Sequence, residues 1–248
     1  MSLLLRSDHP QSMRPFVRMF GSRLDWSAAG EIIHSIQTGR AAVERVAPEG
    51  VWAWYEAHPE QARVFDAAMT AKSASQISAL LPVFDFTPYA TIADIGGGRG
   101  HILAAALEAA PRARGILFDL PHVVQRLDAR PRIALQGADF FHDALPAADL
   151  YLLGNVLHDW PDALAEAILR GVARAATRQA HLLVLEFVLP ETPGPHLAKE
   201  LDVAMLLITG GRERTREEYA ALFAAGGWRL ERVVATQGPL SALLGVPA

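Results

Sequence analysis

The chain contains no cysteine, and this absence excludes several kinds of chemistry at once. Disulfide bonds, thiolate metal sites and thiol nucleophiles all require that residue. Long apolar runs are also missing, because none approaches the ~20 residues that a helix needs to cross a bilayer. The run Leu3–Leu5 near the start is too short for the apolar core of a secretory signal. These absences predict a soluble, cytoplasmic protein.

A strong charge of either sign is missing as well, since the formal net charge is only -4. Without a basic excess to attract polyanions, a nucleic-acid partner is not expected. Hydrophobic residues make up 51% of the chain and charged residues 20%, which is typical of a globular protein. A chain of 248 residues can bury a full core, so one large domain with a smaller appendage is expected.

The pattern of apolar residues changes near residue 90 and divides the chain into two predicted regions. Residues 1–89 show helical spacing without strand alternation and are predicted to be a helical segment. Residues 90–248 alternate strands with helices, the order of a mostly parallel α/β sheet covered on both faces. Strands are predicted at 91–95, 113–118, 132–136, 148–153, 181–188, 228–235 and 240–246. Helices are predicted between them at 99–110, 121–128, 161–177 and 215–225.

A glycine-rich segment follows the first of these strands, where Asp94 to Gly100 reads Asp-Ile-Gly-Gly-Gly-Arg-Gly. Glycine lets the backbone turn sharply and lets a ligand lie against the peptide groups. The helix that follows adds unpaired N–H groups and the positive end of its dipole. Asp119 ends the second strand, where a carboxylate can accept both hydroxyls of a ribose. The order predicts a nucleoside-cofactor site, and a tight turn with Asp119 as a helix cap is the alternative.

The glycine spacing distinguishes between two kinds of cofactor. A dinucleotide site requires Gly-x-Gly-x-x-Gly, but position 101 is a histidine. The loop instead resembles the first motif of the Rossmann-like methyltransferases, which bind S-adenosylmethionine. That resemblance implies that Gly96 and Gly98 approach the methionine and ribose, that an acid binds the ribose hydroxyls, and that an Asp-Phe pair holds the adenine. The residues it assigns to the cofactor are Asp94, Gly96, Gly98, Asp119, Asp139 and Phe140.

A histidine stands where the fourth predicted strand ends, in the segment 155–162, Asn-Val-Leu-His-Asp-Trp-Pro-Asp. Open α/β sheets bind their ligands at the carboxyl ends of the strands. A neutral imidazole there can take a hydroxyl proton as the oxygen attacks a methyl group, which is worth roughly 10²–10⁴ in rate. A local capping role is the alternative, with Asp159 as N-cap and Pro161 at the first helical position. We expect both, with Asp159 capping and His158 facing the pocket.

This segment resembles the plant caffeic-acid-type and bacterial natural-product O-methyltransferases, as do Leu-Glu-Phe-Val-Leu-Pro at 185–190 and Gly-Gly-Arg-Glu-Arg-Thr at 210–215. The resemblance covers nearly the whole chain and implies a Rossmann-like fold with a seven-stranded sheet. It also implies that His158 is the general base and that Glu186 and Glu213 orient it. A carboxylate that accepts the far imidazole N–H fixes the tautomer and stabilises the imidazolium. A solvated charge among neighbouring arginines is the alternative for Glu213.

The same resemblance assigns four residues to the acceptor pocket: Met69, Asn155, Trp160 and Met205. Ordinary core packing is the alternative for them. Gly154 departs from the family, in which a larger, often basic, residue stands four places before the base. Residues 158, 159 and 162 carry possible metal ligands, but a hard cation needs several converging oxygens. Because the resemblance is to the metal-independent branch, no metal is expected.

The resemblance also implies that family members carry a winged-helix-like dimerisation domain before the segment that opens this chain, and we expect most of that domain to be missing here. We therefore expect apolar side chains to be exposed on the helices within 12–80. Those named are Phe16, Phe20, Trp26, Trp52 and Trp54. Besides the small-molecule acceptor, the expected partner is a second copy of the chain or another polypeptide that supplies the missing lid.

These observations predict an S-adenosylmethionine-dependent O-methyltransferase that acts on a hydroxyl of a small aromatic natural product. One alternative is a non-catalytic or partner-dependent subunit of a methyltransferase complex. Another is a member of the same fold with non-methylating chemistry, such as hydroxylation or cyclisation. A nicotinamide-dependent oxidoreductase is a third, which the glycine spacing disfavours.

Overall fold

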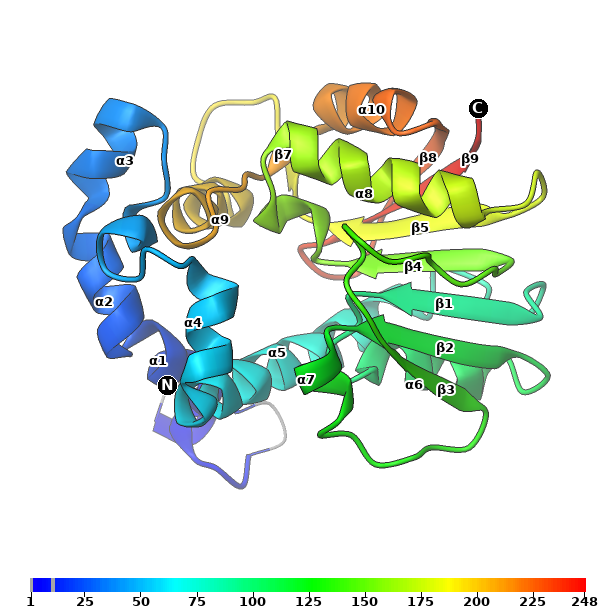
Figure 1. Ribbon diagram of the computed structural model, residues 1–248, viewed down its shortest axis with the longest axis horizontal. Helices are drawn as coiled ribbons and strands as arrows, with labels where there is room; N and C mark the ends of the chain where they lie inside the picture. The colour runs from blue at the N-terminus through cyan, green and yellow to red at the C-terminus, as the bar shows by residue number, and fades with distance from the viewer. Residues whose placement is uncertain (1, 10–11) are drawn as a thin grey trace.

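A computed structural model describes residues 2–9 and 12–248 and places a helical region beside an α/β region (Figure 1). The helical region comprises α1 (Arg14–Phe20), α2 (Arg23–Gly30), α3 (Ile32–Thr38), α4 (Val51–Ala57), α5 (Pro59–Leu80) and the 3-10 helices η1 (Ser2–Leu5) and η2 (Ala42–Arg45). The next part comprises β1 (Thr91–Ile95), α6 (His101–Ala109), β2 (Arg114–Asp119), α7 (Pro121–Val124), β3 (Ile133–Gly137), β4 (Leu150–Gly154), η3 (Leu157–Asp159), α8 (Asp162–Ala175) and β5 (His181–Glu186). The last part comprises β6 (Val188–Leu189), α9 (Leu197–Ile208), β7 (Arg214–Thr215), α10 (Arg216–Ala225), β8 (Trp228–Ala235) and β9 (Ser241–Pro247).

The main sheet has seven strands in the order β3-β2-β1-β4-β5-β9-β8. The first five strands are parallel, and β9 runs antiparallel to both β5 and β8. This confirms the predicted mostly parallel seven-stranded sheet of the Rossmann-like class. Strand order reverses between β1 and β4, and open α/β sheets bind ligands in the crevice at such a switch point. The loops after β1 and β4 therefore leave the sheet side by side at its carboxyl edge.

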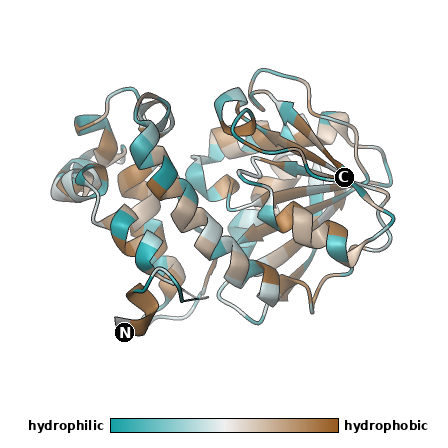
Figure 2. Cartoon of the chain, turned by 90° about the horizontal axis from the view of Figure 1, so that it is seen from below, coloured by the Kyte–Doolittle hydropathy of each residue, from teal (hydrophilic) through white to brown (hydrophobic). Residues whose placement is uncertain are grey.

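Two apolar layers cover the two faces of the sheet, which explains why its central strands read as continuous apolar runs. Alternate residues point to opposite faces: Ile92 and Leu152 pack with α6, whereas Ala93 and Leu153 pack with α8 and α10. The strands are accordingly coloured as hydrophobic along their length in Figure 2. Burial on both faces holds the strands rigid and so fixes the positions of the loops at their carboxyl ends.

Two features of the C-terminal half were not predicted, the helix α9 and the two-stranded parallel sheet formed by β6 and β7. The start of α9 lacks the usual signal, because its N-cap is His196, whose ring accepts the N–H of Ala198. The predicted helix at 121–128 is also shorter than expected, since α7 ends at Val124. The remaining predicted strands and helices of the sheet are present, with boundaries that coincide with the predicted ones or differ by at most two residues.

The helical region exposes apolar side chains, although not all of those expected. Phe20 is 47% and Trp26 77% exposed. The expectation is wrong for Phe16, Trp52 and Trp54, which are partly buried, and the two tryptophans pack on the core of the helical region itself. That a second copy or another polypeptide covers this surface stays a prediction. In the described parts of the chain, no helix is both long enough and apolar enough to cross a membrane.

Candidate active site

The loop after β1 adopts backbone conformations that only glycine takes readily. Gly96, Gly98 and Gly100 have φ values of 69°, 57° and 68°. A Cβ on Gly97 would lie 2.5 Å from the carboxyl group of Asp94, so bulk is excluded there. A Cβ on Gly98 would meet no heavy atom within 4 Å, so this backbone borders open space. A loop of this form lets a ligand approach the peptide groups directly.

Asp119, at the end of β2, holds this loop in place. The N–H of Gly98 donates to its Oδ2 at 2.7 Å, and the N–H of Leu120 donates to its Oδ1 at 2.7 Å. Each carboxylate oxygen keeps capacity for one more donor, as ribose hydroxyls require. Burial and the charge of Asp119 raise the pKa of the neighbouring Asp94 to about 7. The carboxylate oxygens of Asp119, which can each accept a further hydrogen bond, and the open space beside Gly98 fit the nucleoside and methionine portions of S-adenosylmethionine.

The predicted adenine pair, Asp139 and Phe140, follows β3. The N–H of Phe141 donates to Asp139 Oδ1 at 2.9 Å, and the Nδ1 atom of His142 lies 2.9 Å from Oδ2. The carboxylate is thus fixed within its own turn. The Phe140 ring borders Gly96 and meets Trp160 edge to face at 6.0 Å between centroids. Phe140 therefore lies between the glycine loop and the segment that carries the predicted base.

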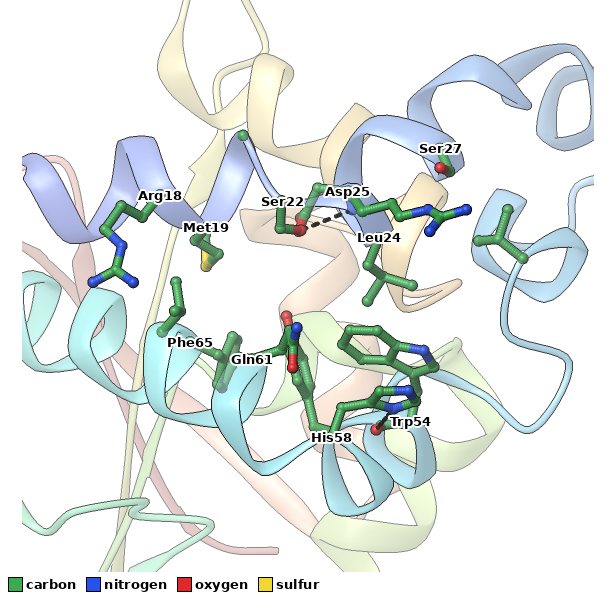
Figure 3. A pocket seen from close by; sticks show the side chains of 15 residues that line it. Arg18, Met19, Ser22, Leu24, Asp25, Ser27, Trp54, His58, Gln61 and Phe65 are labelled. Carbon is green, nitrogen blue, oxygen red and sulfur yellow. Dashed lines mark hydrogen bonds between the residues drawn. The ribbon is translucent and has the colours of Figure 1, made fainter.

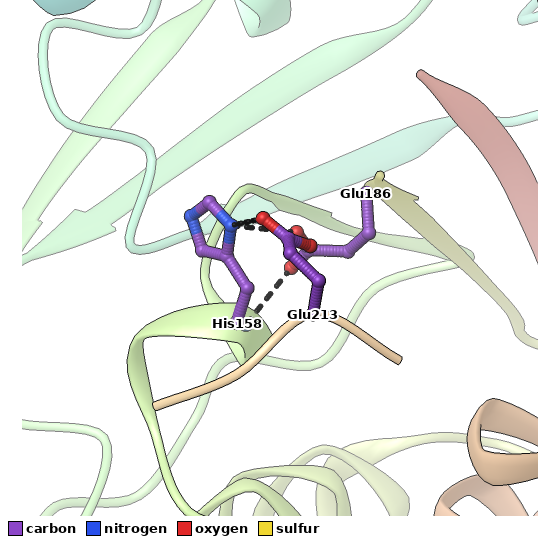
Figure 4. A group of neighbouring side chains, drawn as sticks. All are labelled: His158, Glu186 and Glu213. Carbon is purple, nitrogen blue, oxygen red and sulfur yellow. Dashed lines mark hydrogen bonds and ion pairs between the residues drawn. The ribbon is translucent and has the colours of Figure 1, made fainter. Parts of the chain in front are cut away.

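His158 lies on η3, Glu186 ends β5 and Glu213 directly precedes β7, and the three side chains meet in one buried cluster (Figure 4). Nδ1 of His158 lies 2.8 Å from Glu213 Oε1 and 3.5 Å from Glu186 Oε2. When Nδ1 donates its proton to Glu213, the lone pair of the neutral imidazole stands on Nε2. Figure 4 shows Nε2 turned away from both glutamates. The arrangement is that of a carboxylate-oriented proton acceptor.

Glu186 fixes the backbone on which His158 stands. Its Oε1 accepts the N–H groups of Val156 at 3.1 Å, Leu157 at 2.9 Å and His158 at 3.3 Å. These donors form the unpaired start of η3, so the carboxylate acts as its cap. Burial raises the pKa of Glu186, and it raises the pKa of Glu213 to about 8.

Arg214 was not predicted to have a role at the site, yet it braces the base segment. Its buried guanidinium donates to the carbonyls of Leu157 at 3.1 Å and Trp160 at 2.9 Å. It also makes an ion pair with Asp162 at 2.8 Å. A further close approach occurs at Gly211, where any Cβ would overlap the carbonyl of His158. No local sequence signal marks either residue, because their partners lie far away in the chain.

The expectation that Asp159 caps the following helix is wrong. Helix α8 begins at Asp162 with Pro161 as its N-cap, and no side chain caps it. Asp159 instead ends η3, with Oδ1 3.8 Å from Nε2 of His158. Burial raises the pKa of Asp159 to about 6. The carboxyl group therefore belongs to the surroundings of the base.

The four residues predicted for the acceptor pocket lie on separate elements. Asn155 follows β4 in a left-handed conformation with φ 55°, and its buried Oδ1 has no hydrogen-bond partner among the described residues. Trp160 packs edge to face on Phe141 at 4.8 Å. Met69 and Met205 are partly buried on α5 and α9, and no contact that joins them to His158 is established. Their assignment to the acceptor stays a prediction.

One nitrogen of His158 and one oxygen each of Glu186 and Glu213 lie within 4.8 Å of one another, close enough to share a metal ion. Each residue, however, already has a partner within the protein. Nδ1 is hydrogen-bonded to Glu213, and Glu186 accepts three N–H groups. That the site uses no metal stays a prediction.

A separate cavity of about 830 Å³ lies in the helical region, between the α1–α2 and α4–α5 segments (Figure 3). Its walls include Met19, Leu24, Trp54 and Phe65, and a hydrogen bond joins Ser22 to Asp25 on one side. None of the residues predicted for cofactor, base or acceptor lines it. It is therefore distinct from the site at the edge of the sheet.

The family model of the O-methyltransferase domain matches residues 30–229. The phenazine O-methyltransferase of Lysobacter antibioticus is 40% identical over 97% of this chain and 72% of its own length. The mitomycin biosynthesis 6-O-methyltransferase of Streptomyces lavendulae is 32% identical over 94% of this chain and 68% of its own length. Human N-acetylserotonin methyltransferase in complex with S-adenosylmethionine superimposes with a TM-score of 0.91 at 27% identity, covering 100% of this chain and 74% of the human one. The chain belongs to the S-adenosylmethionine-dependent O-methyltransferase family, whose members include enzymes of natural-product biosynthesis.

Proposed function

We propose that the chain methylates a hydroxyl group of a small aromatic natural product and that His158 is the general base. The observation that carries the proposal is the hydrogen bond of 2.8 Å between Nδ1 of His158 and Oε1 of Glu213. It leaves Nε2 as the proton acceptor, at the sheet edge that also holds the glycine loop.

In this proposal one group accepts the proton of the acceptor hydroxyl and another supplies the methyl group to which the hydroxyl oxygen bonds. S-adenosylmethionine supplies an electrophilic methyl group on a sulfonium. Nε2 of His158 takes the hydroxyl proton while the acceptor oxygen forms its bond to the methyl carbon. The bond from that carbon to the sulfonium sulfur breaks at the same time and leaves S-adenosylhomocysteine. The charge of Glu213 stabilises the resulting imidazolium. The glycine loop and Asp119 hold the donor side still, so positioning contributes to the rate as well.

An aromatic acceptor is supported by the rings beside the base segment. Phe140, Phe141 and Trp160 contact one another edge to face, with centroids 4.7 to 6.0 Å apart. Such a cluster offers faces and edges on which a planar ring can stack. Two relatives are named as a phenazine O-methyltransferase and as a 6-O-methyltransferase of mitomycin biosynthesis, which supports the same class.

The test is a product analysis with matched acceptors. Purified protein is incubated with S-adenosylmethionine and hydroxy-aromatic compounds, each paired with the analogue that carries an amino group instead. We expect S-adenosylhomocysteine and an O-methylated product in equal amounts, measured by mass spectrometry. Methylation of the amino analogues alone would contradict the proposal. If the chain binds the cofactor but methylates nothing, and methylation appears when a second protein is added, the chain would instead be a partner-dependent subunit.

A further inference from the structure

Lys72 is one of only two lysines among the 23 basic residues of the chain. It stands on α5, which runs from the helical region towards the sheet in Figure 1. Its ammonium lies over the ring of Phe187, with Nζ 5.4 Å from the centroid. Because Phe187 directly follows Glu186, α5 brings the ammonium of Lys72 close to the cluster of His158, Glu186 and Glu213.

Apart from that ring, the ammonium of Lys72 has no direct partner in residues 2–9 and 12–248: it makes neither a hydrogen bond nor an ion pair. Lys199, by contrast, donates to the carbonyls of Thr192 and Gly194 at 2.9 Å each. Burial lowers the pKa of Lys72, while Glu186 and the other nearby carboxylates raise it. A buried cation of this kind is retained most readily where it faces negative charge.

The negative charge beside it is incompletely satisfied. Glu186 and Glu213 each have one oxygen, Oε2, that is buried without a hydrogen-bond partner in the described part of the chain. Arg214 is close, but its guanidinium is engaged by Asp162 and by backbone carbonyls. Buried carboxylates that lack donors tend to take up a proton. Among the cations near Glu213, Lys72 opposes such uptake more strongly than Arg214 does.

A proton on Glu213 would disable the proposed base. A carboxylic acid facing Nδ1 donates a hydrogen bond instead of accepting one. The neutral imidazole of His158 would then carry its proton on Nε2 and could not accept another. The charge on Glu213 therefore decides whether the acceptor hydroxyl can be deprotonated.

We propose that Lys72 is a positioning residue, whose ammonium favours the charged form of Glu213 and thereby favours the tautomer of His158 in which Nε2 is free to accept a proton. The proposal rests on the proposed function, because it takes His158 to be the base. The charged and titratable groups that face Glu213 are Lys72 on α5, His158 and Asp159 on η3, Glu186 on β5, Asp202 on α9, Arg214 on β7 and Tyr219 on α10.

The first test measures the pairing without any methyl transfer. Protein labelled with ¹³C-lysine gives two lysine Cε signals in the NMR spectrum, and Lys199→Met assigns them. We expect Glu213→Gln to lower the titration midpoint of Lys72 by about one pH unit, because a nearby carboxylate is lost. The signal of Lys199 is the internal control and keeps its midpoint. An unchanged Lys72 midpoint would overturn the proposal even if the chain proved to methylate nothing.

The second test measures what the pairing does to the reaction. Lys72→Met should move the rising part of the pH profile of kcat/KM to higher pH by about one unit. At pH values below this rise kcat/KM should fall about tenfold, and above the rise the loss should become smaller. Lys72→Arg should restore the rise to its original pH, and Lys199→Met should leave it in place. An equal loss at every pH would indicate a merely structural lysine. If kcat/KM falls only for acidic acceptors and the pH profile does not move, Lys72 would contact the acceptor instead. Either of these two results would overturn the proposal.

Discussion

The loop after β1 and the segment after β4 lie at neighbouring strand ends, but they are built in different ways. At the first, the backbone itself forms the surface, and Asp119 holds it through the N–H groups of Gly98 and Leu120. At the second, the surface is made of side chains, and Glu213 reaches His158 across 55 residues of sequence. Backbone suits the binding of a fixed cofactor, whereas side chains are needed to move a proton.

The difference also separates two kinds of kinetic effect. Changes at the glycine loop should act on the affinity for S-adenosylmethionine, because the groups there hold the donor. Changes at the His158 cluster should act on kcat, because the groups there are proposed to act on the proton during the reaction. Substitutions on the two sides therefore test whether the two strand ends are functionally separate.

The largest expected effect is that of His158→Ala. Removal of the proton acceptor should lower kcat about 10²- to 10⁴-fold, while calorimetry should show unchanged binding of S-adenosylhomocysteine. The matched control is His58→Ala, since His58 is an exposed histidine stacked on Trp54 in the helical region. Methyl transfer undiminished by His158→Ala would remove this residue as the base.

Glu213→Gln should follow, with a loss of about 10- to 100-fold in kcat. The amide oxygen can still accept the N–H of His158, but the charge that stabilises the imidazolium is gone. Burial raises the pKa of Glu213 to about 8, and the ionised form is required. The kcat/KM of the unaltered enzyme should therefore rise with pH through about 8 and then level.

That rising limb should be absent from Glu213→Gln. It should persist in Glu186→Gln, whose amide oxygen can still accept the three N–H groups of η3. The measurement is kcat/KM on both sides of the limb for all three proteins. The same limb in Glu213→Gln would mean that another group titrates, and the role of Glu213 would have to be reassigned.

The same two strand ends show why one part of the site could be predicted from local sequence and the other could not. The stretch from Asp94 to Gly100 lies between a strand and a helix, and Asp119 and the pair Asp139-Phe140 follow it in order, so these local features together indicate a cofactor site. His158, Glu186 and Glu213 were connected only through a family resemblance. Their meeting requires β4, β5 and β7 to converge, which is a property of the packed fold.

Residues that act only through distant partners were missed altogether. Arg214 reads as one of several neighbouring arginines until Asp162, 52 residues away, is seen beside it. Lys72 reads as part of a helix until Phe187 is found under its ammonium. Helix α9 was missed for a local reason, because a histidine replaces the usual capping residue at its start. Asp159 shows the opposite error, because an aspartate that is well suited to cap the following helix does not cap α8.

On the cofactor side, Asp119→Asn should weaken S-adenosylmethionine about tenfold. One of its oxygens becomes an NH2 group, which cannot accept the N–H of Gly98 or Leu120 or a ribose hydroxyl. The measurement is the Kd of S-adenosylmethionine together with kcat at saturation. A large loss of kcat with an unchanged Kd would show that the two strand ends are not functionally separate.

The last effect concerns stability instead of activity and arises at Asp94. The pKa of this buried carboxyl is raised from 3.8 to about 7, so the folded state holds its proton more tightly than the unfolded state does. The stability that this proton contributes is complete below pH 3.8 and is lost as pH rises through about 7. Each pH unit inside that window costs about 1.4 kcal/mol.

Asp94→Asn removes this titration while keeping the size of the side chain. Its Tm, measured without cofactor, should therefore gain on that of the unaltered protein as pH rises to about 7 and then gain no further. Asp128→Asn, at an exposed position, is the control and should show a constant difference. A constant difference for Asp94→Asn as well would mean that this acid stays ionised in the fold.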